Sequence, residues 1–343
     1  MAQSKQDPRM AFDCEQYDQF ASLKRVFILL FYYNDNTIEL LDKQHNRVQL
    51  KRTPIALTRN ELFIGANINV FGNPTLLTGY ADEVTRHLCD EIGEMTVIII
   101  AESAFVSLGR YLSVLTEECG FTVGNIQMCW IQSEHVDKYN LPNELNNTRV
   151  TLVQAVRAAA VEKGMDFVKR SPGTCTAESK EEAALWKDLV LEASRKPLAV
   201  FDEPNSSVVI LKPHLILNQR AGTAIQQLID LELEPTGLTQ LSVSSSMADK
   251  FLEPYRGVLP NVPGTVKSLE GTAWVLQLVS LEDSKDVVNQ VREACGPYDT
   301  VIAKKLFPKT IRAKFGVDQC KNAVHCCDLP GEGPVYTKFF FKK

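Results

Sequence analysis

Residues 304–321 form a stretch of the chain that is rich in positive charge. They carry six basic residues and a single acidic one, Asp318. Arginine can contact two oxygens of a phosphate group at once, and lysine acts on such a group as a point charge. The stretch could therefore hold an anionic group, although a solvated surface is the commoner use of such charges. His325 and two cysteines follow it after three further residues.

The thiol and imidazole side chains at the end of this stretch raise the question of a metal site. They are Cys320, His325, Cys326 and Cys327. Neighbouring cysteines seldom bind one tetrahedral zinc ion well, and no second CxxC or HxxxH cluster would complete the ligand set. The chain has nine cysteines, an odd number, without a CxxC pair. We therefore expect free buried thiols and no metal site.

A second basic stretch lies near the N-terminus. Residues 43–60 contain three arginines and two lysines, and no acidic residue. Two interpretations remain open, namely a surface for an acidic partner and the solvated face of a hairpin. The net charge of the whole chain is −5, so no overall field attracts nucleic acid.

The composition is that of an ordinary globular protein, with 45% hydrophobic and 23% charged residues. At about 150 residues per domain, 343 residues indicate two or three domains. The longest apolar run, Val26–Tyr33, has eight residues, whereas a membrane-spanning helix needs about 20. The first residues contain no apolar stretch of signal-peptide length. We expect no membrane span and a reducing, cytosolic setting.

The first 80 residues are predicted to form short antiparallel strands. Val26–Tyr33 is rich in β-branched and aromatic residues, and the polar turn Asn34–Asn36 follows it. Further strands are predicted at Thr37–Leu41, Arg47–Lys51, Glu61–Ile64, Ile68–Phe71 and Leu76–Tyr80. The pattern indicates an antiparallel meander, or another small sheet or barrel used as a binding module.

From Thr96 onward, strands alternate with helices. An apolar strand at Thr96–Ile100 precedes a helix at 104–119, whose apolar residues share one face, and a strand at Phe121–Ile131. The same order returns roughly 111 residues later, as strand, helix and strand at Val208–Leu211, Ala221–Leu231 and Leu238–Val243. An internal duplication is the economical explanation, and chance repetition of a common unit is the alternative.

The two copies differ in length and in chemistry. The rest of the first copy is predicted to form helices at Val150–Lys163 and Ser179–Leu191 and a strand at Leu198–Phe201. Ala101 stands where the second copy has Lys212, and no Asn-x-x-His string occurs before the second copy. The first copy is thus shortened and lacks a lysine that could hold phosphate, so we expect its role to be structural.

Two strings in the N-terminal segment carry a resemblance. They are FYYNDNTIELLDKQHNRVQLKRT and, after it, LFIGANINVFG. They resemble the small DM-ten domain, which occurs in axonemal proteins and in nucleoside diphosphate kinase 7. The match covers roughly residues 20–90.

Five strings in the second half carry a more specific resemblance. They are VVILKPHLI from residue 208, EPYRG from 253, VREACGP from 291, PKTIRAKFG from 308 and NAVHCCDLP from 322. In this order and at these distances they resemble the nucleoside diphosphate kinase family, specifically its nucleoside diphosphate kinase 7 branch. The resemblance spans residues 207–343.

The two resemblances together imply an α+β protein of three units. The first is an antiparallel β-rich DM-ten module, and two ferredoxin-like (βαββαβ) nucleoside diphosphate kinase-like domains follow, the first of them truncated. The implied boundaries are 1–92 for the module, 93–204 for the degenerate domain and 205–343 for the domain with the histidine motif.

The resemblance also assigns residues to a site. In this family a histidine takes the γ-phosphoryl group from a triphosphate and passes it to a diphosphate, which is covalent catalysis. By resemblance that histidine is His325. Neutral imidazole, with a reference pKa of about 6.5, is a usable nucleophile at physiological pH. The residues that the resemblance assigns to nucleotide binding are Lys212, Tyr255, Arg292, Tyr298, Arg312 and Asn322.

The sequence departs from the family pattern around this histidine. The serine usually found two residues after it is Cys327, and the glutamate usually found eleven residues after it is Tyr336. A thiol is a weak hydrogen-bond partner, and tyrosine cannot supply the negative charge that stabilises one ring tautomer. Tyr298 replaces a threonine that contacts phosphate, and Val262 lies near the position of the aromatic that stacks on the base. These changes predict slow or absent phosphoryl transfer.

The nucleoside diphosphate kinase 7 branch implies a ciliary or flagellar protein. It would be located in the cytoplasm, cytoskeleton and axoneme, and would act mainly as a structural inner protein of doublet microtubules that binds tubulin and other doublet proteins. The alternative is an active kinase that transfers phosphate through phosphorylated His325. Mg²⁺ would then arrive with the bound nucleotide. Neither nucleic acid nor a membrane is expected as a partner.

Overall fold

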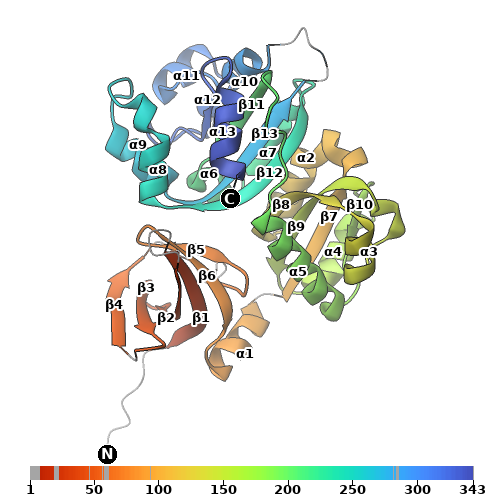
Figure 1. Cartoon of the computed structure of the whole chain (residues 1–343), viewed down its shortest axis with the longest axis vertical. Helices are drawn as coiled ribbons and strands as arrows, with labels where there is room; N and C mark the ends of the chain where they lie inside the picture. The colour runs from red at the N-terminus through yellow and green to blue at the C-terminus, as the bar shows by residue number, and fades with distance from the viewer. Residues whose placement is uncertain are drawn as a thin grey trace, which may run out of the picture.

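In a computed structural model, the strands of the residues described below form two sheets, one of six and one of eight strands (Figure 1). The six-stranded sheet comes first in sequence, and the eight-stranded sheet is built from the remaining strands. No helix among the residues described is long and apolar enough to cross a membrane. The structure describes residues 8–18, 23–45, 47–55, 57, 62–92, 94–280, 282 and 286–342.

The N-terminal sheet is antiparallel, with the strand order β4-β3-β2-β1-β6-β5. One of its faces carries a buried apolar cluster, which includes Phe12, Leu29 and Phe31. Helix α1 (Glu83–Ile92) packs on this cluster through Cys89. The strands are β1 (Arg9–Asp18), β2 (Leu23–Tyr32), β3 (Thr37–Asp42), β4 (Arg47–Pro54), β5 (Asn67–Val70) and β6 (Asn73–Tyr80).

This sheet confirms most of the strands predicted for the first 80 residues and corrects two points. Strand β1 was not among the predictions, although Met10, Phe12 and Cys14 alternate along it as buried residues. The strand predicted at Glu61–Ile64 is wrong for residues 62–64, and Glu61 lies outside the described residues. Residues 62–64 lead instead into a turn, because Gly65 has a φ of +94° that an extended strand does not adopt.

The eight-stranded sheet consists of two halves with one topology. In each half the first strand in sequence lies between the third and the fourth, in the overall order β10-β7-β9-β8-β12-β13-β11-β14. The strands of the first half are β7 (Glu94–Ala101), β8 (Thr122–Ile131), β9 (Thr148–Arg157) and β10 (Thr174–Thr176). Those of the second half are β11 (Ser206–Leu211), β12 (Glu234–Val243), β13 (Gly271–Val279) and β14 (Val324–Cys326).

Helices cover both faces of this sheet. Those of the first half are η2 (Glu102–Ser107), α2 (Leu108–Ser113), η3 (Val114–Glu118), α3 (Ser133–Tyr139), η4 (Asn143–Leu145), α4 (Ala160–Val168) and α5 (Lys180–Arg195). Those of the second half are α6 (Pro213–Leu217), α7 (Ala221–Ile229), α8 (Ser245–Phe251), η5 (Glu253–Tyr255), α9 (Val262–Leu269), α10 (Val287–Cys295), α11 (Thr300–Leu306), α12 (Ile311–Phe315) and α13 (Glu332–Phe341).

The predicted helix at Val150–Lys163 is wrong. Its first part is the central strand β9, and helix α4 begins only at Ala160. β9 pairs with β7 and β8, and helices cover both of its faces, so apolar residues occupy both faces and no period of two remains. The predicted strand at Leu198–Phe201 is also wrong, because the backbone of Val200 bonds to the side chain of Gln277 rather than to a strand.

The two halves meet through equivalent elements. Strands β8 and β12 pair edge to edge, and the hydroxyl of Thr239 donates to Oε1 of Gln127 at 2.7 Å. Helices α2 and α7 cross closely at two glycines. A Cβ on Gly109 would lie 2.2 Å from the backbone nitrogen of Gln226, so only glycine allows this approach. The halves therefore share one continuous sheet and are also joined by the close contact of α2 with α7.

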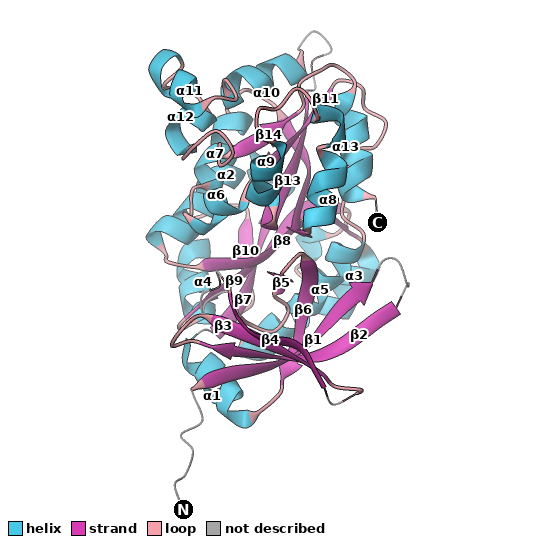
Figure 2. Cartoon of the chain, turned by 90° about the vertical axis from the view of Figure 1, so that its left-hand side faces the viewer, coloured by secondary structure: helices cyan, strands magenta, loops and turns pink. Residues whose placement is uncertain are grey.

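The N-terminal sheet docks on the second half through the turn between β5 and β6. The side chain of Asn69 donates to the carbonyl of Val243 at 2.9 Å, and a Cβ on Gly72 would lie 3.8 Å from that of Ser245. Both views place this sheet at one end of the molecule and helix α11 at the other (Figures 1 and 2). The docked turn thus lies next to the start of α8.

Candidate functional site

His325 is the middle residue of β14, the edge strand of the eight-stranded sheet. It is paired with Ile210 of β11, and only 5% of it is exposed. The chain enters β14 through Ala323, whose φ is +73°. This conformation is uncommon for a residue with a Cβ, and it immediately precedes the strand that carries the histidine.

Three aromatic side chains surround the imidazole. Tyr336 of α13 stacks on it with ring centroids 5.8 Å apart, and its hydroxyl lies 3.1 Å from Nε2. Phe251 of α8 and Tyr255 of η5 meet the ring edge to face, with centroids at 5.1 and 5.2 Å. The hydroxyls of Tyr336 and Tyr255 also bond to each other. The histidine is thus enclosed by rings rather than facing an open cleft.

Electrostatics keep this histidine neutral. Burial lowers the pKa of His325 well below its ordinary value, and the charges of Lys212 and Arg312 lower it further. Burial raises the pKa of the Tyr336 phenol, which stays protonated. A neutral phenol can either give or accept the bond to Nε2, so it does not select one imidazole tautomer as a carboxylate would. Among the described residues, Nε2 has this partner and Nδ1 has none.

Lys212 follows β11 directly and is 1% exposed. Its Nζ donates to the carbonyl oxygen of Cys320 at 2.6 Å and to the hydroxyl of Ser268 at 3.1 Å. Burial lowers the pKa of Lys212 to about 7, and the charge of Arg312 adds to this effect. The ammonium group is therefore bound to the chain itself.

Arg312 of α12 is bound in the same way. Its Nη1 donates to the carbonyl of Gly296 at 2.5 Å, and its Nε and Nη2 donate to the carbonyl of Val324 at 3.3 and 3.2 Å. Only 5% of the residue is exposed. Backbone carbonyls thus accept from three of the five N–H groups of the guanidinium, the groups with which arginine binds phosphate.

Three further residues that the resemblance assigned to the nucleotide lie around this group. The side chain of Asn322 donates to the carbonyl of Tyr298 at 3.2 Å, and its buried Oδ1 has no partner within the described part of the chain. The hydroxyl of Tyr298 lies 2.9 Å from that of Thr265. Arg292 of α10 is exposed and donates to the carbonyl of Asp328, three residues beyond the histidine. The structure therefore gathers the assigned residues at one end of the second half.

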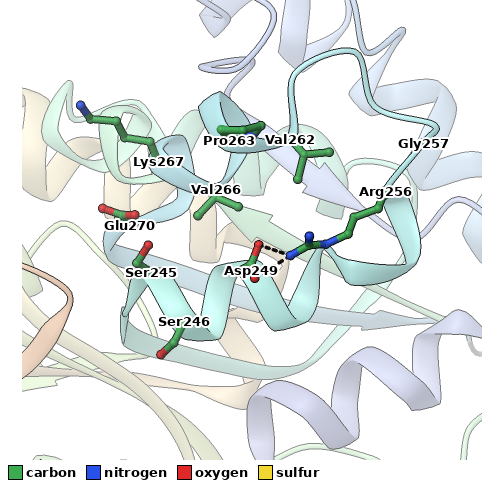
Figure 3. Close-up of a pocket in the computed structure, with 10 residues that line it drawn as sticks. All are labelled: Ser245, Ser246, Asp249, Arg256, Gly257, Val262, Pro263, Val266, Lys267 and Glu270. Carbon is green, nitrogen blue, oxygen red and sulfur yellow. Dashed lines mark hydrogen bonds and ion pairs between the residues drawn. The ribbon is translucent and has the colours of Figure 1, made fainter.

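A hollow of about 740 Å³ opens between α8 and α9 (Figure 3). Arg256 and Asp249 form a two-pronged ion pair on one side of it, with both contacts at 2.7 Å. Val262, near the position expected for a base-stacking aromatic, is part of its wall. His325 and Lys212 are not. The lining residues are Ser245, Ser246, Asp249, Arg256, Gly257, Val262, Pro263, Val266, Lys267 and Glu270.

Three residues of the site were missed by reasoning from the sequence. Phe251 contacts the imidazole and stands four residues before Tyr255, a spacing that could have pointed to it. Ser268 of α9 accepts a hydrogen bond from Lys212, but none of the five family-like strings includes this helix. The Nε2 of His214 accepts from the backbone nitrogen of Ala323 at 3.2 Å, and burial lowers the pKa of His214 to about 4. The string KPH contained this histidine, but nothing local showed its partner.

The described residues contain no group of three or more histidine, cysteine, aspartate or glutamate side chains placed to hold a metal ion. The side chains around His325 are cationic, aromatic or thiol groups, whereas Mg²⁺ prefers oxygen ligands. They do not form a protein cage for Mg²⁺, and an ion at this site would depend on phosphate oxygens.

Comparison with known proteins identifies the family. Residues 205–343 match the family model described as nucleoside diphosphate kinase. A nucleoside diphosphate kinase of Herpetosiphon aurantiacus is 32% identical over 135 residues, which cover 39% of this chain and 86% of that protein. The chain belongs to the nucleoside diphosphate kinase family.

The similarity to one member extends over the whole chain. Nucleoside diphosphate kinase homolog 7 of Rattus norvegicus is 29% identical over 380 residues, covering 100% of this chain and 95% of that protein. This full-length match confirms the resemblance to the nucleoside diphosphate kinase 7 branch. A crystal form of the Aquifex aeolicus nucleoside diphosphate kinase, 27% identical, covers 40% of this chain and 94% of its own, with a TM-score of 0.37.

Proposed function

We propose that this chain is mainly a structural protein of the ciliary or flagellar axoneme, an inner protein of doublet microtubules that binds tubulin and neighbouring doublet proteins. One observation carries the non-catalytic part of this proposal. Lys212 and Arg312 are the two cations whose charge lowers the pKa of His325. Both are already bound to the chain, Lys212 to the carbonyl of Cys320 and Arg312 to that of Gly296. A phosphate would have to compete with these bonds for the two side chains. The axonemal part rests on the resemblance to the nucleoside diphosphate kinase 7 branch.

The surroundings of His325 support the same proposal. Aromatic rings cover the imidazole, and Tyr336 occupies the place of the carboxylate that orients the family's histidine. In-line phosphoryl transfer needs an approach to the nucleophilic nitrogen and a fixed tautomer. The chain retains His325, Lys212 and Arg312 of the family's site but holds these three side chains as part of a packed core.

We also propose a role for each of the three units. Residues 1–92 form a DM-ten module, 93–204 a truncated and degenerate ferredoxin-like kinase domain, and 205–343 the domain with the histidine motif. The shared topology of the two halves supports a duplication. Ala101, at the end of β7, occupies the position of Lys212 in the other half. We propose that the first half serves to hold the second half, by pairing its edge strand β8 with β12 and packing its helix α2 on α7.

The alternative proposal is an active nucleoside diphosphate kinase that works through phosphorylated His325. It is supported by the neutral state of the imidazole and by Nδ1, which has no partner among the described residues. Lys212 and Arg312 would have to turn from carbonyls to phosphate oxygens. In this alternative, Mg²⁺ enters with the nucleotide phosphates.

Fractionation of flagella tests the structural role. The chain is expected to remain with the doublets after extraction with detergent and high salt, because an inner protein is held by tubulin on several sides. Immunoblotting of the soluble and axonemal fractions provides the measurement. Release with the soluble matrix proteins would contradict a doublet-bound role.

Labelling with γ-labelled ATP tests the alternative. Phosphohistidine is acid-labile and base-stable, so its label can be distinguished from phosphoserine. We expect far less than one label per chain in the wild type, because of the bound cations and the covered ring. A stoichiometric label that disappears in His325→Ala would favour the active kinase instead.

A further inference from the structure

Helix α11 and the residue that follows it expose several large apolar side chains. Thr300 and Ala303 on the inner side of the helix are buried, and the side chain of Asp299 caps its first turn. Because Thr300 and Ala303 fix the side of α11 that packs on the protein, the side chains on its other side point toward solvent. Four of them are between 46% and 70% exposed, namely Val301, Ile302, Leu306 and Phe307.

Unpaired positive charge lies among these apolar residues. Lys304, Lys305 and Lys309 are exposed, and none of them has an ion-pair partner among the described residues. Lys314 of α12 donates to the amide oxygen of Gln227 at 2.6 Å. We call Val301, Ile302, Leu306 and Phe307 with Lys304, Lys305 and Lys309 the α11 surface.

The basic stretch of the N-terminal sheet differs in this respect. The ammonium of Lys43 pairs with Asp13 at 2.9 Å, and the guanidinium of Arg52 pairs with Asp35 at 2.7 Å. Much of its charge is thus offset within the sheet. The contrast favours the α11 surface over the described part of residues 43–60 as the contact for an acidic partner.

We propose that the α11 surface binds an acidic protein segment that carries apolar side chains of its own. The lysines attract and orient the segment, and the apolar residues anchor it by burying surface that water now covers. Single exposed apolar residues are common, but four within seven positions form a patch. The inference goes beyond the structural role proposed above, because it names the surface and the partner's chemistry and does not require the partner to be tubulin.

Charge and residue type argue against other occupants. A second copy placed face to face would bring Lys304 and Lys305 against their own counterparts, which costs free energy. Surfaces for single-stranded nucleic acid rely on stacked aromatics and arginine, whereas this surface has one aromatic, Phe307, and no arginine. A lipid-binding helix lies free on the membrane, whereas α11 has seven residues and is packed on one side.

The position of the surface fits a bridging protein. Helix α11 lies at the end of the molecule opposite the N-terminal sheet in both views (Figures 1 and 2). A partner on α11 would leave the exposed edge strand β4 free for other contacts. The chain could therefore contact two proteins at once.

Peptide binding by the full-length chain tests the proposal. The probe is a fluorescent glutamate-rich peptide with interspersed leucine and phenylalanine, and fluorescence anisotropy is measured over a range of salt concentrations. A glutamate-rich peptide with serine in place of the apolar residues is the comparison. We expect the apolar acidic peptide to bind about tenfold more tightly than the serine peptide, and its affinity to fall with salt.

Two variants of the α11 surface separate the contribution of its lysines to peptide binding from that of its apolar side chains. Lys304→Glu with Lys305→Glu should weaken binding about tenfold or more and reduce its salt dependence, and Leu306→Ser with Phe307→Ser should abolish the preference for the apolar peptide. These side chains are exposed, so both variants should fold, which circular dichroism checks. The matched control changes Lys196 and the 72%-exposed Val106, as Lys196→Glu with Val106→Ser, and should bind as the wild type does.

Several outcomes would overturn the proposal. The first two are no binding of the acidic apolar peptide by the wild type, and a loss of affinity in the control variant equal to that in the surface variants. The third is tighter binding of a single-stranded oligonucleotide or of anionic vesicles through the same residues. The fourth is self-association of the chain, seen by light scattering, that the surface variants abolish. The axonemal role is judged separately by fractionation. A chain that binds the peptide but leaves with the soluble matrix would contradict only that role.

Discussion

The hydroxyl of Tyr336 lies 3.1 Å from Nε2 of His325, and both residues are buried. The two side chains come from different elements, the last helix and the edge strand β14. Their contact places a neutral phenol where a nucleoside diphosphate kinase is expected to have a carboxylate. The hydroxyl of Tyr336 is also bonded to that of Tyr255, and the ring of Tyr255 contacts the imidazole edge to face.

The first prediction concerns the identity of residue 336. Tyr336→Glu should increase the phosphohistidine label, about tenfold, because a carboxylate that accepts from Nε2–H leaves the Nδ1 lone pair available. Tyr336→Gln is the matched control, of similar size but without the charge. Labelling with γ-labelled ATP measures both variants. Equal labelling of the two would show that charge at this position does not limit the transfer.

The second prediction follows from the buried Lys212. Its pKa of about 7 lies below the ordinary value of 10.5, so between these two pH values the unfolded chain binds more protons than the folded one. The cost of burying this charge is complete below about pH 7 and disappears as the pH rises toward 10.5. The stability of the wild type should therefore rise with pH relative to Lys212→Met, by up to about 1.4 kcal/mol per pH unit.

Urea unfolding of both proteins at neutral and at alkaline pH measures this slope. The Lys212→Met variant keeps a side chain of similar length and removes the titrating group. Parallel stability curves for the two proteins over this pH range would contradict the lowered pKa.

The third prediction concerns the crossing of α2 and α7. Gly109→Ala should lower the free energy of unfolding by about 2–3 kcal/mol, because the new Cβ would lie 2.2 Å from the backbone of Gln226, which cannot move aside. Gly79→Ala is the control, since its Cβ would meet Asp13 at an ordinary 3.6 Å. Thermal or urea unfolding provides the comparison. Similar losses in both variants would mean that the crossing is not tightly packed.

The fourth prediction concerns an ion-pair group that joins the two halves. Arg149 of β9 pairs with Glu102 of the first half and with Glu234 at the start of β12. The side chain of Arg149 is 15% exposed, so Arg149→Met leaves two carboxylates without their cation and should cost about 1–3 kcal/mol of stability. Urea unfolding at neutral pH measures the loss.

The same group should respond to acid. Hydrogen bonds from Arg149 hold the pKa of Glu102 below its ordinary value of 4.5, so its stabilising effect is present above that pH and is lost as the pH falls. The difference between the wild type and Arg149→Met should therefore shrink as the pH falls from neutral to below 4.5. A difference that stays constant over this range would rule out the carboxylates as its source.

Much of the fold could be predicted from local patterns. The helix predicted at Ser179–Leu191 is α5, and the repeated strand and helix order corresponds to two halves with one topology. The errors lie where burial on two faces removes the periodic pattern. At β9 the apolar residues face helices on both sides, so the segment looks like a helix until its neighbours β7 and β8 are known.

The sequence by itself determined the family and pointed to His325 and Lys212, because the motifs that contain these residues are short, local strings. Only the tertiary structure decided what these residues do. Lys212 is bound by Ser268 and by the carbonyl of Cys320, which are 56 and 108 positions away in the chain. A hydrogen bond across such a distance depends on how β11, α9 and the loop before β14 pack together, and no local pattern encodes that packing.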